Sequence, residues 1–471
     1  MYFARERLRT IAGFPPFGNT PKAFRSTLRG GERAQLQIFR QPDGGGARII
    51  RKLARFAPGF DAARRYHSAV PAQARQSDSS SLANRLTRLA DQCVLCGLCL
   101  PHCPTYALDR QESESPRGRI TLIQALAEQR VSASDVDLQH LEHCLDCRRC
   151  EAACPAKVDY GALLAGGREL LRRRGAPTQQ LDQRLIGSLL ARPRLLHRLL
   201  GLARVVWRWL PRRLSGTMPR PPASARLQQP CNDPSAKKQQ GEVALFLGCV
   251  ARRCGNSALQ AAIDLLSRLG WSVVIPDAQT CCGAQAIHAG EAPRANALAT
   301  SNQLAFTGIA RTVTLDSGCH EALSNSLTGE TLDVLDLLDQ DDAFHRLPWH
   351  NTPIRVAVFA PCTQRHVVRS DAALRRLLAR LPGVEAIWLD IGCCGAAGDH
   401  MLRFPERAAT LREPLLQQLI DSGCDQLLVA NIGCRLHLQA GAEAHGLDTR
   451  VVHPVEFITQ RLLPDMPEDS P

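Results

Sequence analysis

Eight cysteines fall into two copies of one spacing pattern. CVLCGLCLPHCP at 93–104 and CLDCRRCEAACP at 144–155 both follow C-x2-C-x2-C-x3-C-P. In this pattern three closely spaced thiolates bind one iron–sulphur cube, and the fourth, carried away by the proline turn, reaches the cube of the other motif. A zinc ribbon would instead need two C-x2-C pairs separated by a loop. The repeated pattern therefore predicts two 4Fe-4S clusters.

The exchanged fourth cysteine predicts which residues bind each cluster. For the first cluster we expect Cys93, Cys96, Cys99 and Cys154. For the second we expect Cys144, Cys147, Cys150 and Cys103. Two adjacent clusters without an open coordination position conduct electrons and do not catalyse, so no catalytic residue is predicted among them.

The segment between the two motifs has a helical period. Forty residues separate Cys103 from Cys144, and SPRGRITLIQALAEQR at 115–130 places Ile120, Leu122, Ile123 and Leu126 on one face. A minimal bacterial ferredoxin has no room for such an insertion. We therefore expect an α-helical ferredoxin module at 85–175.

The C-terminal half repeats itself. Residues 243–319 and 354–434 each alternate apolar strands with helices and each contain the tripeptide CCG. Four cysteines of one copy have counterparts in the other: Cys249, Cys281, Cys282 and Cys319 match Cys362, Cys393, Cys394 and Cys434. Strands alternating with helices predict mostly parallel sheets. The expected fold class is α+β multidomain, with the ferredoxin module followed by two α/β cysteine-rich domains at 242–345 and 350–471.

These eight cysteines follow the carboxyl ends of predicted strands, where ligand sites in open α/β sheets lie. The adjacent pairs could form strained disulfides, or all eight could be buried structural thiols. Because each pair has distant cysteines that the fold brings close, we favour shared binding of a further iron–sulphur cluster. Gly283 and Gly395 would let the backbone turn tightly beside it.

Several stretches resemble the iron–sulphur subunit of glycolate oxidase, within the wider group of CCG proteins that includes heterodisulfide reductase subunits. They are the two ferredoxin motifs, ESPRGRI at 114, LGCV at 247, CCG at 281 and 393, PCTQRH at 361 and ANIGCRLHL at 430. The resemblance implies a subunit, inactive alone, that takes electrons from partner subunits carrying FAD. Those partners would oxidise a 2-hydroxy acid, glycolate by the best match, and the electrons would pass to a quinone or another acceptor. The alternative is a thiol–disulfide redox enzyme of the heterodisulfide reductase type with a catalytic CCG site.

The chain departs from the wider group where its repeats can end in C-x2-C. Position 322 is alanine and position 437 is histidine, which argues against a five-cysteine cluster. His437 could replace a thiolate, and His366 also lies in a matching stretch. Three histidines beside predicted ligands are expected in exposed loops: His102, His143 and His320. Three cysteines without counterparts are expected to be spare thiols: Cys231, Cys254 and Cys424.

The chain has 471 residues, 19 cysteines and a net charge of +13. Residues 1–80 contain 15 basic and 5 acidic side chains among many helix breakers, so we expect 1–84 to be a disordered, solvated extension that activity does not need. No nucleic-acid-binding motif accompanies this charge. Without a secretory signal pattern, clustered thiols indicate a reducing cytoplasm.

Residues 176–241 are expected to form amphipathic helices and a linker. RPRLLHRLLGLARVVWRWLPRR at 192–213 contains seven arginines and no acidic residue, with an apolar stripe of Leu195, Leu199, Leu202, Val206 and Trp209. No uncharged apolar stretch is long enough to span a bilayer. The stripe could lie on the inner face of the cytoplasmic membrane, or it could pack on the α/β domains or a partner.

Overall fold

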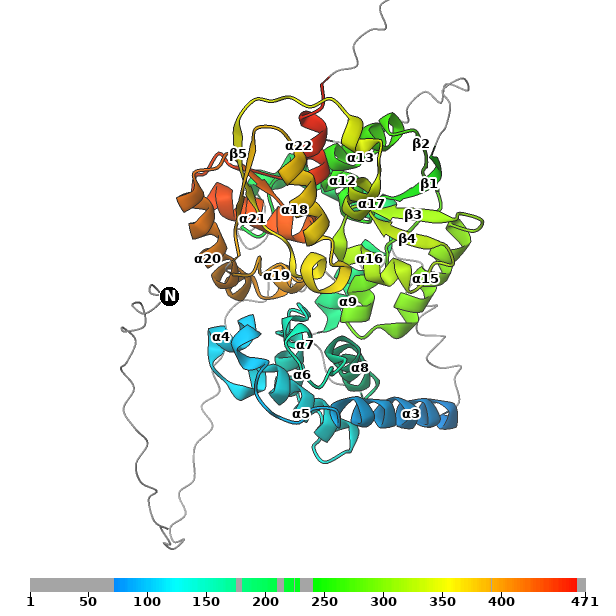
Figure 1. Ribbon diagram of the computed structural model, residues 1–471. Coiled ribbons are helices and arrows are strands. Elements are labelled where there is room, and N and C mark those ends of the chain that lie inside the picture. The colour runs from blue at the N-terminus through cyan, green and yellow to red at the C-terminus, as the bar shows by residue number, and fades with distance from the viewer. Residues whose placement is uncertain are drawn as a thin grey trace, which may run out of the picture. The chain divides into compact units, whose positions relative to one another are not determined.

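The computed structural model describes residues 72–174, 180–209, 216–223, 225–228, 240–390 and 392–463 (Figure 1). Residues 1–71 of the predicted extension lie outside the described residues, and so do Cys231 and the other residues of 229–239.

The N-terminal half of the described chain is helical. It contains α3 (Ala72–Ala90), α4 (Pro104–Asp109), α5 (Pro116–Ala127), α6 (Asp135–Glu142), α7 (Arg149–Ala152) and α8 (Tyr160–Arg173), with short turns η2 (Leu100–His102) and η3 (Glu112–Glu114). Helices α3, α5 and α8 pack on one another around Leu86, Ile123 and Leu163, which are fully buried. Helix α5 begins where Ser115 Oγ accepts a hydrogen bond from the Gly118 amide at 2.9 Å, and the predicted helix is thereby confirmed.

The C-terminal half contains two parallel four-stranded sheets (Figure 1). Their strand orders, β2-β1-β3-β4 and β6-β5-β7-β8, are equivalent, as the sequence repeat predicts. The strands of the first sheet are β1 (Gly241–Phe246), β2 (Trp271–Val274), β3 (Arg311–Thr314) and β4 (Glu330–Asp333). Those of the second are β5 (Ile354–Val358), β6 (Val384–Trp388), β7 (Gln426–Leu428) and β8 (Arg450–Val452). The predicted fold class is confirmed.

Helices connect the strands of each sheet by crossovers, as parallel pairing requires. In the first repeat they are α12 (Ala251–Cys254), α13 (Asn256–Arg268), α14 (Ala284–His288), α15 (Ala292–Ala305), α16 (Ser317–Ser324) and α17 (Val334–Gln340), with the turn η5 (Phe344–Arg346) after them. In the second they are η6 (Gln364–Val368), α18 (Asp371–Arg380), α19 (His400–Arg403), α20 (Pro405–Ser422), α21 (Ile432–Ala444) and α22 (Pro454–Gln460).

The two repeats share one hydrophobic core. Val243 and Val313 of the first sheet belong to the same buried cluster as Val356 and Leu428 of the second. Helix α13 of the first repeat also packs on α22, the last helix of the second. The repeats therefore fold against each other as one body.

Charged side chains join the helical half to both repeats. Arg148 donates to Glu321 of the first repeat at 2.8 Å. Arg149 donates to the Gly392 carbonyl of the second repeat at 2.7 Å, and Arg403 pairs with Glu142 at 2.6 Å. Arg148 and Arg149 both belong to the second cysteine motif. That motif therefore lies at the junction between the two halves.

The segment between the halves forms α9 (Gln180–Leu190), α10 (Pro193–Val206) and the turn η4 (Trp207–Trp209). Within the described part of the chain, no helix is both long and apolar enough to cross a bilayer.

Candidate metal centres

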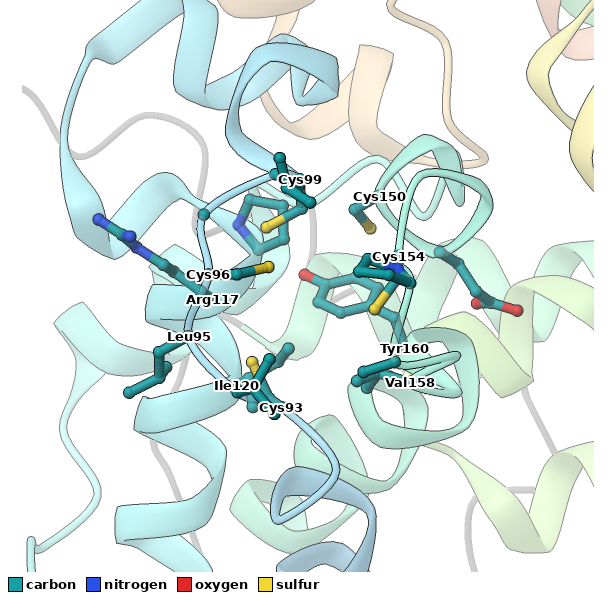
Figure 2. A pocket seen from close by; sticks show the side chains of 17 residues that line it. Cys93, Leu95, Cys96, Cys99, Arg117, Ile120, Cys150, Cys154, Val158 and Tyr160 are labelled. Carbon is teal, nitrogen blue, oxygen red and sulfur yellow. The ribbon is translucent and has the colours of Figure 1, made fainter.

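The first pocket in the helical half is lined by cysteines of both motifs. Cys93, Cys96 and Cys99 come from the loop between α3 and η2, while Cys150 and Cys154 come from α7 and the turn after it. Figure 2 shows the three sulphurs of the first loop facing Cys154 across the pocket.

The second pocket is lined by Cys103, Cys144, Cys147 and Cys150, together with the buried ring of Tyr160. Cys103 therefore lies among the cysteines of the other motif, as the exchange of fourth cysteines predicts. Burial and the nearby thiols of Cys147, Cys144 and Cys103 raise the pKa of Cys150 far above its usual value.

The two motifs share a backbone conformation that curls each loop around its pocket. Leu95 and Gly97 have φ of +55° and +79°, and the matching residues Asp146 and Arg148 have φ of +47° and +54°. Non-glycine residues enter this left-handed region rarely, so the same departure in both motifs marks a common structural demand. Thiolates wrapped around one centre are what an iron–sulphur cube needs, and the residues fit that group.

Polar groups surround the sulphurs of the second pocket. Thr105 Oγ1 lies 3.2 Å from Cys103 Sγ, and the Tyr160 hydroxyl lies 3.4 Å from Cys144 Sγ. Arg119, which is fully buried, donates to Thr105 Oγ1 at 2.9 Å and to Glu114 Oε2 at 2.6 Å. Hydrogen bonds and charge near cluster sulphurs set a reduction potential, so these residues are placed to tune this site.

Glu114 is the centre of a buried ionic network beside the second pocket. His140 Nδ1 and His143 Nδ1 lie 2.7 and 2.8 Å from its Oε1. Burial raises its pKa, but these histidine hydrogen bonds and the charge of Arg119 outweigh burial and lower the pKa to about 2. The three side chains could ligate a metal by their chemistry. Arg119 and Arg407 already supply positive charge, so the group acts as an ion-pair network.

The prediction of exposed loop histidines is wrong for two of the three. His102 is exposed. His143, however, is held by Glu114, and His320 Nδ1 lies 3.0 Å from Thr314 Oγ1 with a pKa lowered by burial. Proximity in sequence to a cysteine gave no information about these side-chain partners.

The first CCG repeat gathers its four matched cysteines. Cys249 follows β1, Cys281 and Cys282 precede α14, and Cys319 lies in the first turn of α16. Thiol hydrogen bonds from Cys249 and Cys282 hold the pKa of Cys281 well below its usual value, whereas the pKa values of Cys249 and Cys282 are raised.

The second repeat places its cysteines in the same way. Cys394 Sγ lies 2.7 Å from Cys434 Sγ, and the pKa of Cys362 is raised by burial and by the thiols of Cys393 and Cys394. A disulfide would need about 2.05 Å. All described cysteines are free, so the disulfide alternative is not what the structure shows. Buried thiols that converge on one point favour a bound cation.

Gly395 has the backbone that the CCG pattern predicts. Its φ is +71°, and a Cβ at this position would clash with the Ala408 carbonyl of α20. Gly283, its counterpart, also has a positive φ of +90°. Both tripeptides therefore turn as expected, tightly and beside a helix.

His437 contacts the second cysteine site through the backbone. Its Nδ1 lies 2.6 Å from the Cys394 carbonyl, and burial and Arg412 lower its pKa to about 4. Its Nε2 is buried without a hydrogen-bond partner among the described residues. His366 is half-buried, with a pKa lowered by burial and by Arg149. Cys254 is partly buried and Cys424 buried.

The second pocket adjoins the second CCG site. Cys147 and Leu145 belong to one apolar cluster with Cys393 and Leu411. Burial, followed by the thiols of Cys362 and Cys393, raises the pKa of Cys147 well above its usual value. The charge of Arg149 also acts on Cys362 and Cys393, but it only partly offsets the burial and the neighbouring thiols that raise their pKa values. Sequence reasoning missed this junction, although the doublet Arg148–Arg149 inside the motif was a signal for it.

Comparison with known families and relatives agrees with this geometry. Residues 89–158 match the family described as 4Fe-4S dicluster domain, and residues 243–324 and 356–439 match the cysteine-rich domain called CCG. The chain is a 4Fe-4S dicluster protein with two CCG domains, and its dicluster domain implies two 4Fe-4S clusters.

Similarity to individual curated proteins extends beyond these domains. "Glycolate oxidase iron-sulfur subunit" of Escherichia coli (strain K12) is 28% identical over 79% of this chain and 93% of its own length. "Probable glycolate oxidase iron-sulfur subunit" of Bacillus subtilis (strain 168) is 28% identical over 78% of this chain and 93% of its own. "Lactate utilization protein A" of Geobacillus kaustophilus (strain HTA426) is 25% identical over 47% of this chain and 99% of its own.

Proposed function

We propose that the protein is the iron–sulphur electron-transfer subunit of a flavin-dependent glycolate dehydrogenase complex. Its partners would be FAD-binding subunits that oxidise the 2-hydroxy acid and release electrons singly. The observation that carries the proposal is the similarity to the two glycolate oxidase subunits, which extends over 93% of each of them and includes both kinds of cysteine site.

The proposed ligand sets follow from the pockets. Cys93, Cys96, Cys99 and Cys154 would hold one cluster, and Cys103, Cys144, Cys147 and Cys150 the other. A further cluster is proposed for the CCG cysteines. Cys147 packs on the apolar cluster that contains Cys393, and this proximity supports electron exchange between the helical half and the second repeat, because transfer is fastest between neighbouring centres.

The proposed substrate is glycolate. The lactate-utilisation relative corresponds to only 47% of this chain, whereas the glycolate oxidase subunits correspond to almost 80%. The electron acceptor is proposed to be a quinone or another oxidant.

The test uses the purified full chain with clusters reconstituted under anaerobic conditions. It is offered glycolate, D-lactate and L-lactate with an artificial electron acceptor, alone and with the candidate FAD subunits. We expect no turnover by the chain alone and glycolate-dependent reduction of its clusters when the flavoprotein is added. Iron–sulphur centres pass single electrons, so a flavin must divide the pair.

Turnover by the chain without a flavoprotein would contradict the proposal. Reduction of a disulfide substrate by the same preparation would favour the second candidate, a thiol–disulfide redox enzyme. The observation that favours this candidate is the close approach of two buried thiols, Cys394 and Cys434, whose sulphurs lie 2.7 Å apart.

A further inference from the structure

Helix α10 presents an apolar stripe outward. Its exposed side chains, with the fraction exposed, are Leu195 40%, Leu199 40%, Leu202 61% and Val205 71%, and Trp209 of the adjoining η4 is 82% exposed. At 100° per residue the three leucines lie on one face of the helix. Val206, predicted as part of the stripe, is half-buried, and Val205 takes its place.

The opposite face of α10 packs on the first CCG repeat. His197 Nε2 lies 3.3 Å from Arg253 Nη1, and Gly201 lies against the same guanidinium. Arg204 donates to the Pro221 carbonyl at 2.8 Å. The helix therefore uses its small and polar face for folding. The apolar stripe therefore does not pack on the α/β domains, which was one of the alternatives that the sequence left open.

The charged side chains of the helix itself all have one sign. Arg192, Arg194 and Arg198 are exposed beside the leucines, and residues 192–213 contain seven arginines and no acidic residue. Arg252 of α12 has a pKa lowered by burial and by the like charge of Arg194. A protein partner that covered this surface would have to supply many carboxylates together with an apolar groove. An anionic bilayer supplies both negative charge and an apolar layer.

We propose that α10 is an interfacial helix that binds the protein to an anionic lipid surface. Leucines, valine and tryptophan enter the boundary between head groups and acyl chains, while the arginines contact lipid phosphates. The described helix is about 21 Å long at 1.5 Å per residue, so it lies in the interface and does not cross it.

This orientation of α10 has a consequence for the cysteine site of the first CCG repeat. Leu190 and Ala191, at the turn between α9 and α10, pack on the buried cluster that contains Cys281 and Cys282. A membrane-bound α10 therefore brings that site close to the lipid, where a quinone would dissolve. This consequence rests on the proposed function, whereas the lipid contact itself does not.

The test is sedimentation of the full chain with vesicles. One set contains phosphatidylethanolamine with phosphatidylglycerol, and the other phosphatidylcholine alone. We expect strong binding to the first set, weakened by salt, and weak binding to the second. Leu199→Ser with Leu202→Ser should reduce binding at least tenfold, because each buried leucine contributes more than 1.4 kcal/mol, about tenfold in affinity. Trp209 emission should shift to the blue with lipid, and Trp209→Phe should remove the shift.

Leu304→Ser is the control, since Leu304 on α15 is a leucine outside the stripe that is even more exposed than Leu199 and Leu202, with 74% of its surface accessible. It should bind vesicles like the wild type. Iron content and melting temperature should be unchanged in all variants, because the altered side chains are exposed.

Three results would overturn the proposal. They are equal binding to both vesicle sets, undiminished binding by the double leucine variant, and self-association of the wild type that the double variant loses. The second result would assign lipid binding to the basic residues before Ala72. The third would assign the stripe to a copy of this chain. None of them bears on turnover with the flavoprotein, which tests the proposed function separately.

Discussion

At the scale of single residues, Cys103 lines the pocket of the second motif and Cys154 lines the pocket of the first. Each pocket draws cysteines from both loops, so neither loop completes a four-cysteine site by itself. The left-handed backbone at Leu95 and Asp146 shows that each loop is shaped for this purpose.

Cys103→Ser should therefore damage the centre held by Cys144, Cys147 and Cys150. We expect loss of roughly half of the dicluster iron and an EPR spectrum like that of Cys147→Ser. Cys96→Ser, in the first pocket, provides the contrasting spectrum, and Cys424→Ser should retain full iron content. A Cys103→Ser spectrum that matches Cys96→Ser would mean that the ligands are not exchanged.

A buried carboxyl should make stability depend on pH. Burial, with the neighbouring Asp336 carboxylate, raises the pKa of Asp333 to about 7, above the unfolded value of about 3.9. The folded state then holds the proton more tightly, so this group favours folding below about pH 4 and loses that contribution as pH rises through about 7.

Asp333→Asn keeps the cap, since Asp333 Oδ1 accepts from the Leu335 amide at 3.0 Å and asparagine caps equally well. Relative to wild type, the variant should gain unfolding free energy between about pH 5 and about pH 8, on the order of 1 kcal/mol per pH unit. Urea unfolding at both pH values measures this. A constant difference between the two proteins would show that Asp333 is ionised throughout.

At the scale of elements, the turn after the second CCG cysteine pair is confined by a helix packed against it. Gly395 meets the Ala408 carbonyl, whereas Gly398, three residues later and also at positive φ, has open space around it. Substituting each of these two glycines therefore distinguishes the free-energy cost of a strained backbone from that of a steric clash.

Gly395→Ala should destabilise the second repeat by more than Gly398→Ala. We expect about 1 kcal/mol for Gly398→Ala, from the left-handed backbone alone, and more than about 2 kcal/mol for Gly395→Ala. Denaturant unfolding gives both values, and the displaced α20 should also lower iron retention in Gly395→Ala. Equal costs would show that α20 moves away freely.

At the scale of the whole molecule, buried ion pairs join the helical half to the CCG half. The side chains of Glu142 and Arg403 are only 3% and 6% exposed, and their charged groups lie 2.6 Å apart. Removing one member of such a pair leaves the other charged and buried, which costs about 3–5 kcal/mol.

Glu142→Gln should therefore destabilise the chain by about 3 kcal/mol and expose the junction to protease. Glu169→Gln is the control, because Glu169 pairs with Arg173 on one helix, where such pairs contribute about 0.3–0.5 kcal/mol. Similar losses from both changes would show that the two halves are held together by other contacts.

The sequence predicted individual helices, sheets and cysteine groups better than it predicted the contacts between them. Regular spacing predicted α5, the repeated sheets and the grouping of Cys103 with the second motif, because each depends on periodicity or on a fixed motif. The Glu114 network and the contact of Cys147 with Cys393 involve residues up to hundreds of positions apart. Such contacts depend on how whole elements pack, and no local pattern encodes that packing. For the same reason, the outward orientation of the α10 stripe needed the structure.

The sharing of cysteines between loops also shapes how the protein assembles. When either pocket forms, the two ends of the 104–143 segment come together. The chain then loses the conformational entropy that closing this loop costs. The other pocket then forms without a second closure. Most molecules should therefore carry either both iron–sulphur centres or none. Molecules with a single centre should be scarce. When iron is limiting, the population would divide into complete and empty molecules, so the supply of iron would set the number of working copies and leave the quality of each unchanged.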